Sequence, residues 1–134
     1  MESYENLLLA QQFYNMGLKY LENENYNDAI RFFSKAIDFS KNVNHPGVYF
    51  SRADAYQGIG EFQKAIDDYN NIWANDLVIS DELKNYKYFN IGNVYFKAGN
   101  ISEALINYKK ALSFNPNDYQ AQHMIMQLQN KYNL

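Results

Sequence analysis

The chain has 134 residues, of which 47% are apolar and 20% charged, with a formal net charge of −3. These values are typical of one globular domain or a short repeat array, and they exclude a disordered chain. The absence of cysteine excludes a disulfide framework, a thiolate zinc site and a cysteine nucleophile. With only two arginines, Arg31 and Arg52, and no clustered excess of basic residues, a nucleic-acid partner is not expected.

The N-terminal region carries no sign of export or of membrane insertion. The longest uninterrupted apolar run, Leu7 to Ala10, is far too short to span a bilayer. Glu2 and Glu5 stand where a signal peptide would carry basic residues, and no signal-type apolar segment follows them. We therefore expect a cytoplasmic protein without a membrane partner.

The first predicted element is a helical hairpin within residues 10–43. One apolar stripe at helical spacing indicates its first helix: Phe13, Met16, Gly17 and Tyr20. A second stripe indicates its second helix: Ala29, Phe32, Phe33, Ala36 and Ile37. The polar residues 23–25 between the stripes are typical of a turn.

Two further hairpins are predicted, within residues 46–79 and 85–118. Pro46 suits the first position of a helix, and Ser80 followed by two acids suits an N-cap. The breaks inside these hairpins contain Gly60 and Gly99, which suit helix C-termini. A last helix, over about 118–132, opens at Asn117 or Asp118. Its predicted apolar face is Ala121, Met124, Ile125, Leu128 and Tyr132.

The three hairpins repeat one another around three equivalent alanines, Ala29, Ala65 and Ala104. Four other columns hold a fixed distance from these alanines. They are a tyrosine (Tyr20, Tyr56, Tyr95), a small residue (Gly17, Ala53, Gly92), an aromatic before it (Phe13, Tyr49, Tyr88) and an aromatic after it (Phe33, Tyr69, Tyr108). A register held three times indicates an internal repeat.

This pattern resembles the tetratricopeptide repeat, in which a W-x₂-L-G-x₂-Y stretch precedes A-x₃-F and a proline. The third hairpin is most similar, since it adds Ala111 and Pro116 at the matching places. The resemblance implies an all-α solenoid of seven helices, treated as a single domain over residues 1–134. Three helix-turn-helix units and a capping helix would then form a short right-handed superhelix with a concave groove.

Members of this family line the groove with the first helices of successive repeats, which implies a non-enzymatic module that binds a protein or peptide. The groove-lining residues implied here are Tyr14, Leu18, Leu21, Phe50, Asp54, Gln57, Tyr86, Phe89, Asn93, Phe96 and Lys97. A groove with this many aromatic residues favours an extended or helical peptide as its ligand. The alternative is that several rings, Tyr14 and Phe50 foremost, pack between adjacent first helices.

Some family members bind acidic chaperone tails through a clamp of lysine, asparagine and arginine. At the corresponding positions this chain has Tyr14, Leu18, Ser51, Tyr86 and Asn90. None of these side chains is cationic, so a clamp for two carboxylates is not expected.

Two features depart from the family pattern. Arg52 stands where the family has leucine, and we expect its stem to pack while its head reaches solvent or an acid. The alternative role for Arg52 is to anchor a ligand. The apolar run Leu77, Val78 and Ile79 lies in a connection, where it either covers the second hairpin or forms a partner or self-association surface.

No catalytic or metal-binding constellation is predicted. His45 and His123 fall on different units, and no spacing typical of metal ligands occurs. Asp67 and Asp68 are adjacent, which suits a solvated helix face better than an acid–base pair. We therefore expect neither an enzyme nor a cofactor. Two alternatives to a general binding module remain: a chaperone resembling those of type III secretion, and a structural protein that self-assembles through residues 77–79 or the terminal helix.

Overall fold

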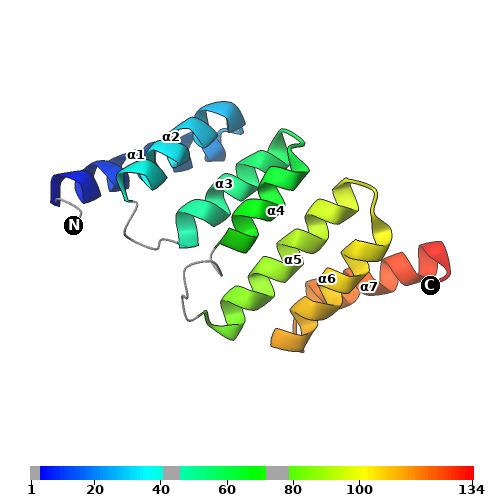
Figure 1. The fold of residues 1–134 in the computed structure, drawn as a ribbon. Helices are drawn as coiled ribbons and strands as arrows, with labels where there is room; N and C mark the ends of the chain where they lie inside the picture. Colours follow the sequence, from blue (N-terminus) through cyan, green and yellow to red (C-terminus); the bar gives the residue numbers. More distant parts are fainter. Residues whose placement is uncertain (1–3, 41–45, 72–78) are drawn as a thin grey trace. The chain divides into compact units, whose positions relative to one another are not determined.

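The computed structural model of the chain describes residues 4–40, 46–71 and 79–134. Seven helices and no strand occur in these ranges, which confirms the all-α prediction (Figure 1). The helices are α1 (Tyr4–Glu22), α2 (Tyr26–Phe39), α3 (Pro46–Gly58), α4 (Phe62–Asn71), α5 (Asp81–Lys97), α6 (Ile101–Phe114) and α7 (Tyr119–Tyr132).

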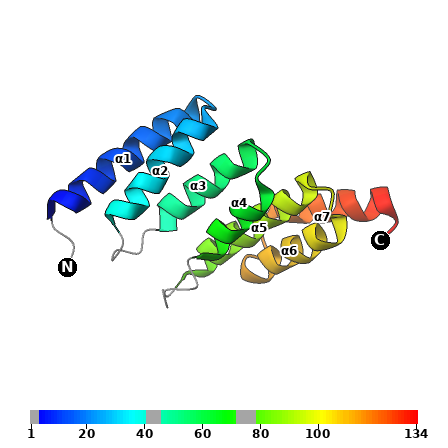
Figure 2. The ribbon, with the colours of Figure 1, turned by 45° about the horizontal axis from the view of Figure 1, so that its top comes forward.

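The internal contacts divide the chain into two compact units, residues 1–77 and 78–134. In the first unit, α1 packs on α2, α2 on α3 and α3 on α4; α1 and α2 lie side by side in Figures 1 and 2. In the second unit, α5 packs on α6, and α6 packs on α7. Each hairpin thus buries one stripe of each helix against its partner.

In the first and third hairpins, a ring of the second helix lies over a glycine of the first. A Cβ atom placed on Gly17 would lie 2.5 Å from Cε1 of Phe33. A Cβ atom on Gly92 would lie 2.7 Å from Cδ1 of Tyr108. Because real Cβ atoms do not come so close to a buried ring, both positions require glycine at this spacing.

The stripe predicted for α1 is correct in three of its four members. Phe13 and Tyr20 stack on Phe32 with ring centroids 6.1 and 5.4 Å apart, and Gly17 is buried. Met16, however, is 42% exposed, so its assignment to the buried stripe was wrong. Gly17 occupies the line of closest contact, and Met16, one residue earlier, lies about 100° away around the helix.

The turn of each hairpin has the same backbone form. The residue at the turn has a left-handed φ in all three: +60° for Glu24, +77° for Gly60 and +84° for Gly99. The next amide then bonds back to the tyrosine five residues earlier, as Asn25 N does to Tyr20 O at 2.9 Å. A left-handed residue followed by this backbone hydrogen bond is characteristic of a Schellman motif, which glycine adopts without steric cost. The first hairpin makes the same turn with a glutamate.

The predicted helix starts are also observed. Pro46 is the first residue of α3. Ser80 Oγ accepts from Leu83 N at 3.2 Å, which makes Ser80 the N-cap of α5. Of the two candidates for the last helix, Asp118 is the cap, and its carboxylate accepts from Ala121 N at 3.0 Å. Each cap satisfies one backbone N–H that the helix itself leaves without a partner.

Replacing Gly92 by leucine should overpack the third hairpin, because its new side chain would enter the ring of Tyr108. We expect Gly92→Leu to lower the free energy of unfolding by about 1–3 kcal/mol or more. Lys131→Ala, on the exposed face of α7, should change it by less than about 0.5 kcal/mol. Denaturant titration measures both, and equal midpoints would contradict the register of the third repeat.

The left-handed turn residues offer a second test. Glu24→Gly should stabilise the chain by up to about 1 kcal/mol, because glycine adopts positive φ without strain. Gly99→Ala should destabilise it by about 1 kcal/mol through φ alone, since a Cβ there would meet no atom within 4 Å. Thermal unfolding of the two variants should therefore shift in opposite directions; shifts of the same sign would refute this account of the turns.

Candidate functional site

In each hairpin, one ring of the first helix forms a tilted pair with a ring of the second helix. The three ring pairs are Tyr14 with Phe33, Phe50 with Tyr69 and Phe89 with Tyr108, at centroid distances of 5.8, 5.6 and 5.6 Å. Their interplanar angles, 52°, 47° and 49°, are nearly the same. Such tilted pairs are a favoured aromatic geometry. These rings therefore contribute to packing within the hairpins, whether or not they also bind a partner.

The burial of the first-helix rings differs between hairpins. Phe50 is only 6% exposed and is a core residue of the first unit. Tyr14 and Phe89 are half-buried, so each has one side against its hairpin and another toward solvent. The sequence left open whether these rings pack or bind, and Phe50 packs. The ring that it packs on belongs to the second helix of its own hairpin.

Polar residues on the first helices hold the tyrosine hydroxyls of the second helices. Tyr69 Oη donates to Asp54 Oδ1 at 2.5 Å and accepts from Gln57 Nε2 at 2.8 Å. Tyr108 Oη donates to Asn93 Oδ1 at 2.7 Å. Burial raises the pKa of Tyr108 to about 12, so its hydroxyl remains a donor at neutral pH. These polar side chains therefore fix the rings of the hairpins.

The first hairpin lacks this hydrogen bond on both sides. Its second-helix ring is Phe33, which has no hydroxyl, and Leu18 occupies the place that Asp54 and Asn93 hold in the other hairpins. The residue at this place is thus polar where the ring is a tyrosine and apolar where it is a phenylalanine. A polar acceptor opposite phenylalanine would have no hydroxyl to donate to it, whereas leucine needs no hydrogen-bond donor.

Three of the four exposed residues of the predicted surface are large and apolar. Leu18 on α1 is 37% exposed, and Tyr86 and Phe96 on α5 are 42% and 41% exposed. Lys97 is also exposed, whereas Leu21 packs against the core of the first unit. On the second helices of the hairpins, α2, α4 and α6, the only large apolar side chain so exposed is Ile106, at 45%.

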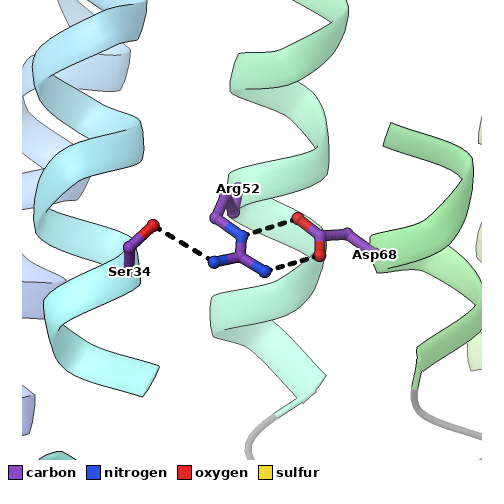
Figure 3. A network of polar contacts seen from close by, with 3 residues as sticks. All are labelled: Ser34, Arg52 and Asp68. Atoms are coloured by element: carbon purple, nitrogen blue, oxygen red, sulfur yellow. Dashed lines mark hydrogen bonds and ion pairs between the residues drawn. The ribbon is translucent and has the colours of Figure 1, made fainter. Parts of the chain in front are cut away.

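Arg52, at the place of a family leucine, joins three helices of the first unit (Figure 3). Its Nε and Nη2 atoms donate to the two carboxylate oxygens of Asp68, each at 2.7 Å. Its Nη1 atom donates to Ser34 Oγ at 3.1 Å. The three side chains come from α2, α3 and α4. The guanidinium head therefore reaches an acid, as expected, and its three nitrogens are engaged within the unit instead of facing a ligand.

The pair of acids on α4 behaves differently from the prediction. Asp67 is exposed, as expected, but the Asp68 side chain is only 7% exposed, so the solvated assignment was wrong for Asp68. Burial raises the pKa of Asp68, and the hydrogen bonds and charge of Arg52 oppose that rise. Burial alone would lower the pKa of Arg52, but the hydrogen bond and charge of Asp68 raise it overall. The two hydrogen bonds of 2.7 Å give the pair the bidentate geometry of an arginine–carboxylate ion pair.

Arg52→Leu restores the family residue but leaves the Asp68 carboxylate buried without its cation. We expect this variant to lose about 3–5 kcal/mol of stability. The double variant Arg52→Leu with Asp68→Leu should recover most of that loss, because no charge is then left without a partner. Urea unfolding of the single and double variants measures this coupling; additive losses would show that the pair does not act as a unit.

The sequence did not point to one pocket in the second unit. It has a volume of about 290 Å³ and is lined by Asn85, Tyr86, Phe89, Asn90, Asn115, Asp118 and Gln120. Only Tyr86 and Phe89 belong to the predicted surface, and Asp118 was considered only as a helix cap. The available signal was spacing: Asn85 and Asp118 stand at the two ends of one repeat, where a solenoid brings consecutive helices together.

The described residues contain no group of three His, Asp or Glu side chains that could hold a metal ion. His123 is exposed on α7, whereas His45 lies outside the described residues. Leu77 and Val78 also lie outside them, and Ile79, the last residue of that apolar run, is buried. No helix within the described ranges has the length and apolar character needed to cross a membrane.

Models of the tetratricopeptide repeat match residues 10–43 and 86–118, which together make up half of the chain. The chain belongs to the tetratricopeptide repeat family. The matched ranges coincide with the first and third hairpins, α1–α2 and α5–α6. Proteins of this family are interaction modules, and this chain is a protein-interaction module of the same kind.

Two relatives illustrate the similarity in sequence. The chain is 29% identical over 121 residues to heat shock protein STI1 of Saccharomyces cerevisiae, covering 90% of this chain and 20% of that protein. It is 31% identical over 114 residues to small glutamine-rich tetratricopeptide repeat-containing protein 2 of Mycosarcoma maydis, covering 85% of this chain and 30% of that protein. The chain thus spans less than a third of the length of either relative.

Two solved structures illustrate the similarity in fold. The first tetratricopeptide repeat domain of Spaghetti (RPAP3), bound to the HSP90 peptide SRMEEVD, has a TM-score of 0.76 at 23% identity and covers 96% of both chains. The Yersinia enterocolitica type III secretion chaperone SycD, in complex with a peptide of the translocator YopD, has a TM-score of 0.75 at 16% identity. That match covers 91% of this chain and 93% of SycD.

Proposed function

We propose that the chain binds polypeptide segments through those faces of its first helices, α1 and α3 in the first unit and α5 in the second, that carry the predicted surface residues. The observation that carries the proposal is an asymmetry between the two helices of the first hairpin and between those of the third. Leu18, Tyr86 and Phe96 on first helices are more than one-third exposed, whereas the second helices α2, α4 and α6 expose one large apolar residue. Exposed apolar side chains gathered on one kind of helix favour an interaction surface.

The packing behind this surface also suits binding. Tyr14 and Phe89 are fixed by their ring partners, and Asp54 and Asn93 are held by hydrogen bonds to tyrosine hydroxyls. Side chains that are already ordered lose little conformational entropy when a partner docks. A peptide placed on α1 or α5 would therefore meet a prearranged surface rather than one that must order on binding.

The partner proposed here differs from the HSP90 peptide of the RPAP3 complex. At the places of the cationic clamp, Tyr14 Oη lies 3.5 Å from Ser51 Oγ, and Asn90 donates its amide hydrogen to the Tyr86 carbonyl at 2.8 Å. With no cation at these places, a C-terminal acidic tail has no bidentate partner. We propose an apolar or aromatic segment, extended or helical, as the natural ligand.

Leu18→Ala and Phe96→Ala should each weaken binding of such a segment by about 1–3 kcal/mol, the range of an interface anchor. Peptides selected from a display library on the immobilised chain provide the ligand, and calorimetric titration of wild type and variants gives the dissociation constants. Ile106→Ala is the matched control, because Ile106 is similarly exposed on a second helix. A loss as large in Ile106→Ala would place the binding surface elsewhere.

The peptide SRMEEVD, with its acidic tail, serves as the contrasting ligand in the same titration. It should bind far more weakly than the selected peptides, and affinity for the selected peptides should depend little on salt. Tight, salt-sensitive binding of SRMEEVD would overturn the proposed partner chemistry while leaving the interaction-module assignment in place.

Two alternatives predict different behaviour in solution. A chaperone for an export substrate would hold an apolar segment on the same faces, so the selected peptides would resemble segments of a co-purifying translocator. A self-assembling structural protein would instead bind its own copies, and its sedimentation coefficient would rise with concentration. Analytical ultracentrifugation of the isolated chain separates this last alternative from the other two.

A further inference from the structure

The pocket of the second unit has walls of two kinds. Two aromatic rings, Tyr86 and Phe89, come from one side of α5, and polar side chains come from α5, the α6–α7 turn and the start of α7. Tyr86 is exposed, so its ring is accessible to a ligand. Phe89 is tilted against Tyr108 and cannot move freely. The pocket therefore offers one accessible and one fixed aromatic wall.

The orientation of the amides in this pocket follows from their hydrogen bonds. Asn85 Nδ2 donates to Ala111 O at 3.0 Å and to Asp118 Oδ2 at 2.8 Å, and both of these partners can only accept. Asn90 Nδ2 likewise donates to the Tyr86 carbonyl at 2.8 Å. In both side chains the nitrogen is used within the unit, which leaves the amide oxygen as the group that can accept from a ligand.

The charge of the pocket is negative. Among the described lining residues, Asp118 is the only acidic one, and none is Lys, Arg or His. The carboxylate of Asp118 accepts from Ala121 N and from Asn85, and each oxygen has a second lone pair. Nearby lysines lie against rings outside the lining: Lys84 is 5.3 Å from the ring of Phe114.

We propose that this pocket binds the cationic head of an arginine or lysine side chain from the partner segment; the proposal deepens the interaction function above and rests on it. The head would lie over the Tyr86 ring and donate to the oxygens of Asn90 and Asp118. Arginine fits better than lysine, because its planar fork can stack on the ring and donate to two acceptors together. An anionic ligand would meet the Asp118 carboxylate and no cation.

The test uses small probes and needs no natural partner. Nα-acetyl-arginine-N-methylamide is titrated into the ¹⁵N-labelled chain at fixed ionic strength, with the lysine and glutamate equivalents in parallel. The arginine probe should give saturable shifts at backbone amides around Asn85, Asn90 and Asp118, with a dissociation constant on the order of millimolar. The lysine probe should bind more weakly, and the glutamate probe should give no saturable shift at these amides.

Substitutions in the pocket test whether the arginine probe binds to Tyr86 and Asp118. Tyr86→Ala and Asp118→Asn should each weaken the arginine probe about two- to fivefold. Asparagine is as good an N-cap as aspartate, so the start of α7 is kept. Glu103→Gln removes the same charge from α6 outside the pocket lining and should leave binding unchanged. Circular dichroism and thermal unfolding confirm that each variant is folded.

Three results would overturn the proposal: no saturable shift with arginine, equal or tighter binding of glutamate, or unchanged affinity in both pocket variants. These results are separable from a failure of the proposed function. Peptides selected from the library would still lose affinity in Leu18→Ala and Phe96→Ala if only the pocket were wrong. If instead the arginine probe binds while no peptide is selected, the pocket stands and the larger surface fails.

Discussion

The contact between a second-helix ring and a first-helix glycine is the constraint on which the first and third hairpins depend. Where Phe33 covers Gly17, or Tyr108 covers Gly92, the two helices approach too closely for any Cβ atom between them. A tilted aromatic pair accompanies this contact in both hairpins, and the second hairpin forms the same pair with Ala53 in place of the glycine. In the first and third hairpins, the position of the residue after the glycine, Leu18 or Asn93, is therefore a consequence of a missing side chain next to a large one.

Local patterns in the sequence were sufficient for the helices, because helix position depends on periodicity and on end signals that act over a few residues. Ser80, Asp118 and the glycine turns are such signals. Met16 was wrongly assigned to the buried stripe because Met16 and Gly17 lie three and four residues after Phe13. Both spacings fit one helix face, so the spacing alone does not tell which of the two residues contacts the partner helix. The turn at Glu24 was predicted from the polar residues between the two stripes. Its left-handed backbone was not predicted, because glutamate rarely adopts positive φ.

The candidate site was harder to predict because exposure and polar pairing are tertiary properties. Register placed Phe50 and Phe96 on the same kind of surface, yet one is buried and the other exposed. Arg52 was recognised as unusual, but its partner Asp68 lies sixteen positions away on another helix, and no local pattern links them. Asn85 and Asp118 meet for the same reason, across one repeat. Pairs of this kind depend on helix packing that has to be known first.

The matching of ring and acceptor between the two helices of a hairpin has an evolutionary meaning. The first hairpin combines Phe33 with Leu18, while Tyr69 donates to Asp54 and Tyr108 donates to Asn93. A duplication or exchange of whole repeats would preserve each match, whereas a crossover that joined Leu18 of the first hairpin to a second-helix tyrosine would leave that hydroxyl without its acceptor. For the first hairpin, the unit that can be exchanged without such a loss is thus the complete hairpin.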